Sequence, residues 1–181
     1  MSSESGLEMT HRQPQSIPRQ PLYTPEERRR RDASPWTLVQ GILAPIQFVV
    51  FLVSLYLVLR YLVTGEGEGI ATISVVVKTL VLYTIMITGA IWEKVVFGRY
   101  LFAPAFFWED VFSMLVLALH TAYLIALATQ MVDVQGQMLL ALAAYATYVI
   151  NAGQFLIKLR AARLDAAHRD RPDGALAEAA E

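Results

Sequence analysis

The sequence contains no cysteine and little histidine, and both shortages limit the chemistry that the protein can perform. Without cysteine there is no disulfide bond, thiolate nucleophile, iron–sulfur cluster or cysteine-ligated zinc. Of the three histidines, His11 and His168 lie in polar terminal segments, which leaves too few imidazoles for a histidine-rich metal centre. Catalysis must therefore use carboxylates, one imidazole, hydroxyl groups or a bound substrate.

Charged residues are also scarce, and the two signs nearly cancel. Only 17% of the residues are charged, whereas 55% are hydrophobic, and 15 basic and 16 acidic residues give a net charge of -1. Binding to nucleic acid requires a clustered positive surface, so the composition excludes nucleic acid as a partner. This balance of apolar and charged residues indicates a membrane protein.

Four long apolar segments account for most of the chain. Each reaches the length of about 20 residues that crosses the hydrocarbon layer of a membrane. The connections between them are short, which favours antiparallel neighbours. The sequence therefore predicts an all-α polytopic membrane protein with four transmembrane helices in an antiparallel bundle. The predicted helices cover residues 37–63, 70–97, 105–130 and 137–159.

The predicted organisation has three parts: a tail of residues 1–34, a transmembrane domain of residues 35–160 and a second tail of residues 161–181. The start of the chain and the segment beyond Asp165 are polar and lack apolar periodicity, so we expect them to be disordered. Within the first tail, Thr24 is a good helix cap, Pro25 suits the first helical position, and two acids follow. This pattern predicts a short helix near residues 25–32.

Basic residues indicate how the bundle is oriented. They precede the first predicted helix, flank the middle loop as Lys94 and Arg99, and follow the fourth helix, whereas the first and third loops have none. Because positive residues concentrate on the cytoplasmic side of membrane proteins, both termini and the middle loop are predicted to be cytoplasmic.

Ionisable side chains inside the predicted helices are the best candidates for a functional site, because they are costly in hydrocarbon. The candidates are Glu93, Glu109, Asp110 and His120. An alternative for Glu109 and Asp110 is that they match the dipole of a helix N-terminus. Against this, both would lie beyond the first turn if Pro104 were the first helical residue. Adjacent positions diverge by about 100°, so only one of the two is expected to face the interior.

Glu109 shares one face of its helix with residues at successive spacings of four, three, four and three, which makes it the better inward candidate. His120 is eleven residues further on, about 16 Å along the axis, so the two side chains would bracket one large ligand. The structural alternative for His120 is a hydrogen bond to a neighbouring helix. The whole stripe is Glu109, Ser113, Val116, His120 and Tyr123.

Several other polar residues have structural explanations. Lys94, beside Trp92, fits an interfacial position, and a snorkelling lysine at the outer interface is a serious explanation for Lys78. Glu93 is less easily explained in this way, because the short middle loop should return the chain close to Glu109. Hydrogen bonding between helices is the favoured explanation for the amides Gln40, Gln47, Asn151 and Gln154.

From the residues alone, the protein is a four-helix membrane protein with an acidic, aromatic-lined site on its cytoplasmic side. Two functions remain open: an enzyme for a lipophilic substrate, and a membrane subunit that binds a cofactor. A bis-histidine haem needs two axial imidazoles, and only His120 lies in a predicted helix, which weakens the cytochrome version of the second function.

Four strings of residues resemble the 3-vinyl (bacterio)chlorophyllide hydratase family of bacteriochlorophyll biosynthesis. They are YTPEERRRRDASPWTLVQ at 23–40, IWEKVVFG at 91–98, LFAPAFFWEDVFS at 101–113 and HTAY at 120–123. The resemblance extends over residues 23 to 159 and is specific, because long aromatic and acidic strings of this kind rarely recur by chance. It implies addition of water across the C3 vinyl group of chlorophyllide a or bacteriochlorophyllide a, giving a 1-hydroxyethyl group.

The resemblance carries over no catalytic residues, so the expected roles come from the chemistry of vinyl hydration. Protonation of the terminal vinyl carbon leaves a cation beside the macrocycle, and water then attacks that cation. Glu109, among aromatic side chains, suits the proton donor, because a carboxylic acid can stay protonated there. Asp110 or Glu93, in ionised form, would orient the water and stabilise the cation.

The remaining expectations concern binding. His120 is expected to hold the pigment and to be able to ligate its magnesium, while no cofactor and no metal of the protein's own are expected, since magnesium is part of the substrate. Aromatic residues are expected to stack on the macrocycle, although an aromatic belt at the membrane interface is a simpler explanation. They are Tyr83, Phe106, Phe107, Trp108 and Tyr123.

The expected partners are the magnesium chlorin and membrane lipids. A homo-oligomer or a complex with other enzymes of the pathway is compatible with the sequence. The expected location is the bacterial inner membrane, cytoplasmic or intracytoplasmic. The alternative functions are a non-catalytic membrane subunit that binds a tetrapyrrole or quinone, and a scaffold on which pigment and pathway enzymes assemble.

Overall fold

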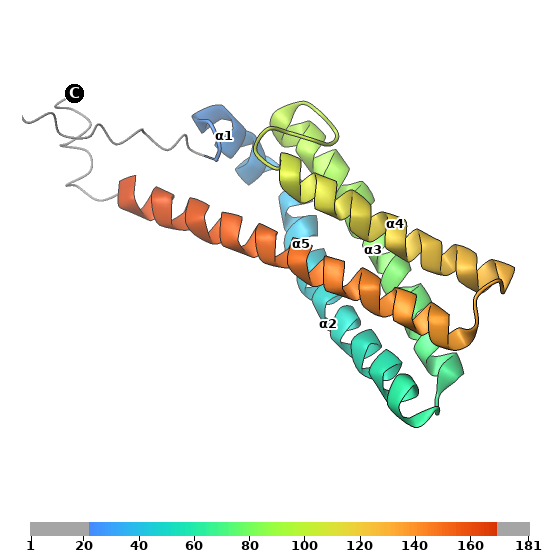
Figure 1. Ribbon diagram of the computed structural model, residues 1–181. Coiled ribbons are helices and arrows are strands. Elements are labelled where there is room, and N and C mark those ends of the chain that lie inside the picture. Colours follow the sequence, from blue (N-terminus) through green and yellow to red (C-terminus); the bar gives the residue numbers. More distant parts are fainter. Residues whose placement is uncertain (1–21, 170–181) are drawn as a thin grey trace, which may run out of the picture.

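The computed structural model describes residues 22–169, with side chains described as far as Leu164. Five helices follow one another in this part of the chain: α1 (Pro25–Ala33), α2 (Pro35–Thr64), α3 (Glu68–Phe97), α4 (Phe107–Thr129) and α5 (Val134–Arg169) (Figure 1). The last four are long and apolar enough to cross a membrane. They confirm the predicted all-α class with four transmembrane helices.

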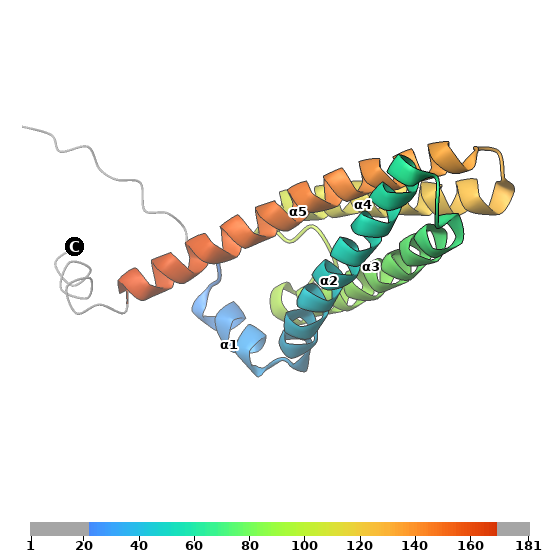
Figure 2. The same ribbon diagram turned by 90° about the horizontal axis from the view of Figure 1, so that it is seen from below.

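The two ends of the chain differ in how they compare with the expectation of disorder. The expected disorder of residues 1–21 and 170–181 falls outside the described residues. Beyond Asp165, however, α5 continues as a helix through Arg169. The last turns of α5 extend past the rest of the bundle, as Figures 1 and 2 show.

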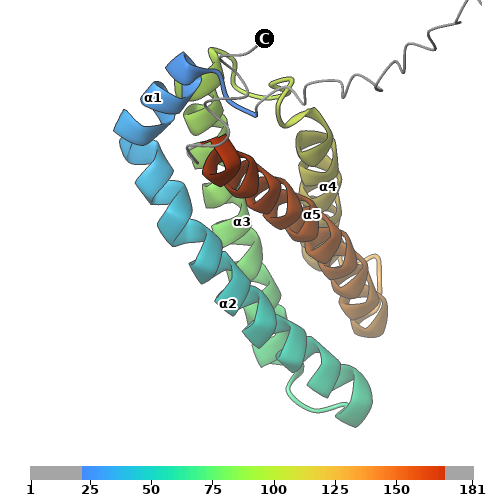
Figure 3. The same cartoon turned by 90° about the vertical axis from the view of Figure 1, so that its left-hand side faces the viewer.

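The four long helices form two antiparallel hairpins, one of α2 with α3 and one of α4 with α5. Helices pack more extensively within each hairpin than between the two. We call the boundary between the hairpins the seam. In the view of Figure 3, α5 lies between α2 and α4, so it closes the seam on one side. The two hairpin turns, residues 65–67 and 130–133, lie away from α1, and we call the opposite end the α1 end (Figure 1).

Local sequence signals explain where the first two helices begin and end. Thr24 caps α1: its hydroxyl accepts from the Glu27 backbone N–H (3.2 Å), and the Glu27 carboxylate accepts from the Thr24 N–H (2.8 Å). Ser34 ends α1 and caps α2, with Pro35 at the first helical position. Helix α2 ends at Gly65, whose φ of 72° is a left-handed conformation that glycine adopts without strain.

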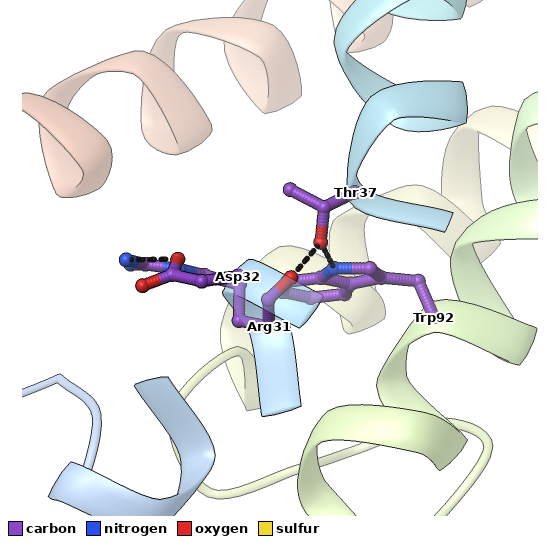
Figure 4. Close-up of polar contacts among 4 residues, drawn as sticks. All are labelled: Arg31, Asp32, Thr37 and Trp92. Atoms are coloured by element: carbon purple, nitrogen blue, oxygen red, sulfur yellow. Dashed lines mark hydrogen bonds and ion pairs between the residues drawn. The ribbon is translucent and has the colours of Figure 1, made fainter. Parts of the chain in front are cut away.

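A polar contact fixes α1 to the bundle. The Thr37 hydroxyl donates to the backbone carbonyl of Arg31 (2.6 Å) and accepts from the indole N–H of Trp92 (2.9 Å) (Figure 4). One side chain of α2 therefore joins the last turn of α1 to the end of α3. Arg31 also forms an ion pair with Asp32 (2.8 Å) in the same view.

An aromatic cluster at the α1 end surrounds this contact. Tyr23 stacks on Phe97, with 5.8 Å between ring centroids, and Phe106 packs against both rings. The Arg31 guanidinium lies 4.7 Å from the centroid of the Tyr23 ring. Burial raises the pKa of Tyr23 above its ordinary value, so this phenol stays neutral at physiological pH. The Phe106 ring of this cluster also lies against Lys158, the ion-pair partner of Glu109 described below.

The start of α4 differs from the prediction. Phe102 has a φ of 59°, in the left-handed region, and the Phe106 N–H donates to the Ala103 carbonyl (2.8 Å), so residues 103–106 form a turn. Helix α4 therefore begins at Phe107 and not at Pro104. This places Glu109 and Asp110 in the first turn, where the helix dipole favours negative charge, contrary to the expected position beyond it.

The hydrophobic core occupies the half of the bundle away from α1. It is built from all four long helices, and large apolar side chains on the outer surfaces remain exposed, as expected for helices in lipid. The core residues are Phe51, Val58, Ala71, Val75, Tyr123, Met138, Ala141 and Tyr145.

Candidate active site

Three buried carboxyl groups gather at the α1 end of the bundle. Glu93 is in the last turns of α3, and Glu109 and Asp110 are in the first turn of α4. The loop of residues 98–106 brings the two helix ends together, as the sequence analysis expected for Glu93 and Glu109. Both Glu109 and Asp110 are buried, so the expectation that only one of them would face the interior is wrong. The reason is that aromatic and loop residues also cover the end of the bundle.

The loop supplies backbone N–H groups to two of these carboxyls. The Phe102 N–H donates to Asp110 Oδ2 (2.7 Å), and the Ala103 N–H lies 3.4 Å from Glu93 Oε2. The carboxyl groups of Glu93 and Asp110 are also close enough to interact with each other. Phe102, whose amide holds Asp110, is the residue with the left-handed backbone conformation, a strained one for a side chain of this size.

Glu109 has a different partner. Its Oε2 atom forms an ion pair with Lys158 Nζ of α5 at 2.6 Å, and the ammonium group also lies 5.0 Å from the centroid of the Phe106 ring. This pair places a positive charge directly beside the Glu109 carboxyl group. Sequence reasoning placed Lys158 among the basic residues after the fourth predicted helix, which set the orientation and face the lipid headgroups, and not in the site. A signal was present, since Lys158 is seven residues after Asn151 and therefore on the same face of α5.

The predicted stripe on α4 is confirmed, because all five of its residues are buried along one face. Ser113 accepts a hydrogen bond from the Asn151 amide of α5 at 2.8 Å. Asn151 thus joins two helices, as predicted for it, and so does Gln40, whose amide donates to the Thr88 hydroxyl at 2.7 Å. The stripe faces α5 near the carboxylates and α3 at His120.

Lys78 and His120 meet in the middle of the bundle and are both fully buried. Lys78 Nζ lies 2.6 Å from His120 Nε2, and His120 Nδ1 lies 2.8 Å from the Val116 carbonyl. The interpretation of Lys78 as a snorkelling residue is therefore wrong: its side chain points across the seam to α4. Both ring nitrogens of His120 are engaged by these contacts, so ligation of a pigment's magnesium through Nε2 would require the contact with Lys78 to open. The hydrogen bond to a neighbouring helix, the structural alternative for His120, is present.

The aromatic residues expected to stack on a pigment are dispersed. Trp108 is 66% exposed and Phe107 44% exposed, so both lie on the outer surface at the α1 end, as an interfacial aromatic belt requires. The Tyr83 hydroxyl is 2.7 Å from that of Thr121, a contact across the seam. Tyr123 is in the hydrophobic core. Of the five, only Phe106 is buried beside the carboxylates.

Several buried polar atoms between the two charged clusters have no hydrogen-bond partner within the described part of the chain. Both polar atoms of the Gln47 side chain are in this state, and so are the carbonyl oxygens of Asn151 and Gln154. Gln47 is on α2 and the other two are on α5, so they face the interior from two helices. The prediction that Gln47 bonds a neighbouring helix is wrong. Unsatisfied buried amides of this kind need a partner such as water or a ligand.

Among residues 22–164, whose side chains the structure describes, no group of three histidine, aspartate or glutamate side chains is placed to hold a metal ion. The groups at the α1 end are three carboxyls and one ion pair, and they can donate a proton, accept a proton and stabilise a developing positive charge.

Comparison with known proteins identifies the family. The family model for 2-vinyl bacteriochlorophyllide hydratase matches residues 23–161. The chain belongs to this family. It is 72% identical over 157 residues to the 2-vinyl bacteriochlorophyllide hydratase of Rhodobacter capsulatus, covering 87% of this chain and 91% of that protein. It is 71% identical over 151 residues to the protein of the same name from Cereibacter sphaeroides, covering 83% of this chain and 93% of the relative. No solved structure matches the chain.

The hydratase family model covers every residue of both charged clusters. Its description names a vinyl group of the bacteriochlorophyllide as the group that is hydrated. Membership confirms the resemblance seen in the sequence and makes the protein a hydro-lyase of bacteriochlorophyll synthesis. A non-catalytic cofactor subunit or a scaffold finds no support in these matches.

Proposed function

We propose that the protein hydrates the vinyl group of a magnesium chlorin at the carboxylate cluster of its α1 end. The observation that carries this proposal is the gathering of Glu93, Glu109 and Asp110 at one buried place in a chain that belongs to a hydratase family. Hydration needs a proton donor, a base for water and stabilisation of a cation, and three carboxyl groups can divide these roles.

We propose Asp110 and Glu93 together as the proton donor. Two carboxyl groups in contact do not both ionise readily, because like charges repel at short distance, so such a pair retains a proton. Neither group has an ion-pair partner among the described residues. Glu109, which the sequence analysis favoured as the donor, is engaged in an ion pair with Lys158 and is assigned the stabilisation of the cation instead. The two roles are therefore exchanged relative to the sequence-based assignment.

The proposed reaction has two steps. The proton of the Asp110–Glu93 pair moves to the terminal vinyl carbon, and the adjacent carbon becomes a cation that is stabilised by conjugation with the macrocycle and by the negative charge of Glu109. A water molecule then forms a bond to the cationic carbon and gives up one proton to the carboxyl pair, which restores the pair. The balance is one water added, with no oxidation or reduction and no cofactor required.

The loop of residues 98–106 is proposed to position the donor. Its backbone N–H groups at Phe102 and Ala103 orient the Asp110 and Glu93 carboxyls. These donors are neutral, unlike the ammonium group that pairs with Glu109. Rigid support of this kind matters because proton transfer requires the acid to lie within hydrogen-bond reach of the accepting carbon.

The surroundings of the enzyme are also part of the proposal. We propose the bacterial inner membrane, cytoplasmic or intracytoplasmic, as its location, with lipids around the four long helices and the α1 end on the cytoplasmic side. A homo-oligomer or a complex with other enzymes of the pathway would pass on the poorly soluble pigment. A reporter fused after Glu181 should be active in the cytoplasm, and activity only in the periplasm would contradict the orientation.

The decisive experiment for the function is hydration in heavy-oxygen water. The purified protein is incubated with chlorophyllide a in H₂¹⁸O, and the product is followed by absorption and mass. We expect a blue-shifted product that has gained one molecule of heavy water, because loss of the vinyl group shortens the conjugation. A pigment that binds and is recovered unchanged would contradict the proposed function.

A further inference from the structure

Given the hydratase function proposed above, we propose that Lys78 binds a carboxylate on the edge of the macrocycle, the free propionate of the chlorophyllide, while the vinyl group lies at the carboxylate cluster. This assigns to the middle of the bundle a binding site for the acid group of the substrate. It also gives a physical reason why an enzyme of this kind would use the free acid and not an ester with a long alcohol.

The ammonium group of Lys78 lacks a counter-charge. Lys78 is fully buried, and no carboxylate lies within 4.0 Å of its ammonium group among the described residues. An ammonium group in this environment is costly unless an opposite charge accompanies it. The surrounding groups are a neutral imidazole acceptor and the rings of Tyr145 and Tyr148, whose centroids lie 5.2 and 4.3 Å from Nζ. A bound carboxylate would supply the missing charge.

Lys78 also has N–H groups available to donate to a ligand. The contact of His120 Nδ1 with the Val116 carbonyl requires that this nitrogen carry the proton, so Nε2 is the acceptor and takes one N–H of Lys78. Lys78 then has two further N–H groups without a hydrogen-bond partner in the described part of the chain. His120 thus holds the ammonium in place, and a carboxylate can accept from what remains.

The separation of the two clusters matches the size of the pigment. His120 lies ten residues after Asp110 on α4, about 15 Å along the helix axis, which is comparable with the span of a tetrapyrrole and its edge groups. The unsatisfied amides of Gln47, Asn151 and Gln154 provide polar atoms along this interval. They can bond to the polar groups on the rim of a macrocycle, which the helix backbones cannot do because their N–H and C=O groups bond to each other.

The seam offers a pigment a route to both clusters. Lys78 meets His120 and Glu93 meets Asp110 across the seam, whereas the stronger packing lies within the hairpins. A flat pigment that entered from the lipid between α3 and α4 would reach both clusters by separating the hairpins, with little change inside either of them. The seam is also crossed by the contact between Tyr83 and Thr121.

The test compares chlorophyllide a with its methyl ester, which keeps the macrocycle and removes the negative charge. Binding to the detergent-purified protein is followed by the absorption of the pigment. We expect the wild-type protein to bind the acid more tightly than the ester by roughly tenfold or more, as for a hydrogen bond to a charged group. Equal affinities for acid and ester would overturn the proposal without any variant being needed.

Two variants locate the effect. Lys78→Gln should bind acid and ester equally when affinity is normalised to folded protein, and Lys94→Gln, an exposed lysine of the same helix, should keep the wild-type preference. A preference for the acid that survives in Lys78→Gln would place the carboxylate elsewhere. The measurement is one of binding, so it is distinct from the failure of the function itself, in which neither pigment would gain heavy oxygen.

Discussion

Backbone N–H groups hold the carboxylate cluster, whereas a side chain holds Lys78. The difference follows from where each cluster lies in the bundle. At the α1 end, helices stop, and the free N–H groups of the loop can donate to Glu93 and Asp110. In the middle of the bundle the backbone groups are already used within helices, so Lys78 can bond only to a side chain or to a ligand. The comparison teaches that anionic groups are readily held at helix ends, whereas a charge between helices needs a dedicated partner.

The two clusters also serve different purposes in our proposals: the carboxylate cluster carries out the reaction, and the Lys78–His120 pair binds the substrate. The carboxylate cluster is buried at the end of the bundle beside the loop of residues 98–106, and its acids can supply the proton that a hydration reaction requires. The Lys78–His120 pair is fully buried among aromatic rings, where a charge contact with a substrate is strong because little water competes for it. Variants at the first cluster should therefore lower the rate, and variants at the second should lower affinity.

The largest effect is expected at the proposed donor. Asp110→Asn and Glu93→Gln should each reduce the rate of hydration by roughly 10²–10⁴, because the amide keeps the shape and loses the transferable proton. Initial rates of product formation, normalised to folded protein, measure this effect. Glu66→Gln is the matched control, since Glu66 is an exposed acid at the far end that pairs only with Arg60 at 3.5 Å. Rates close to wild type in both donor variants would remove the pair from the mechanism.

The next effect concerns Glu109. Glu109→Gln should lower the rate by about tenfold, because it removes a charge that stabilises the cation but leaves an amide that still bonds to Lys158. If Glu109 is the donor, as the sequence analysis expected, its loss will exceed that of Asp110→Asn. The double variant Glu109→Gln with Lys158→Gln removes both charges of this ion pair and leaves neither one without its partner, so it separates loss of folding from loss of catalysis.

A smaller effect, on affinity, is expected at His120. His120→Leu removes the acceptor that holds Lys78 and should weaken binding of chlorophyllide a by roughly five- to tenfold while the turnover of bound pigment stays near wild type. The measurement is an absorption titration together with saturating rates. His120→Gln, which retains an acceptor, should recover part of the affinity. If His120 serves only in packing, the yield of folded protein will fall and the affinity per folded molecule will not change.

The smallest effect is expected at a contact that supports the second cluster without touching it. The Ser54 hydroxyl of α2 bonds to the Tyr145 hydroxyl of α5, and Tyr145 packs on His120 with 5.9 Å between ring centroids. Ser54→Ala should lower the free energy of unfolding by about 1 kcal/mol, as for other hydrogen bonds between membrane helices. Thermal unfolding in detergent measures this, with the exposed Thr84→Ala as control. A change in hydration rate above about threefold would show that Ser54 acts in the site itself.

The successes and failures of the sequence analysis have separate physical origins. The four long helices and the buried stripe from Glu109 to Tyr123 were predictable, because hydropathy and helical spacing are properties of each segment alone. The partners of Lys78 and Lys158 were not, because they depend on how separate helices cross. The start of α4 was placed too early because the left-handed backbone of Phe102 has no marker in the sequence: glycine is the usual residue there, and phenylalanine is not.

The burial of Lys78 has a consequence for the biogenesis of the protein. A lysine near the centre of a transmembrane helix opposes insertion by about 2.5–3.5 kcal/mol on scales from translocon experiments. Helix α3 precedes α4 in the chain, so a translocon that receives the helices in order meets Lys78 before α4 has placed His120 beside the ammonium group. Its apolar residues and its hairpin with α2 must carry this charge alone. The hairpin of α2 and α3 must therefore stay in the membrane without the contact between Lys78 and His120. That contact forms when the hairpin of α4 and α5 has been inserted.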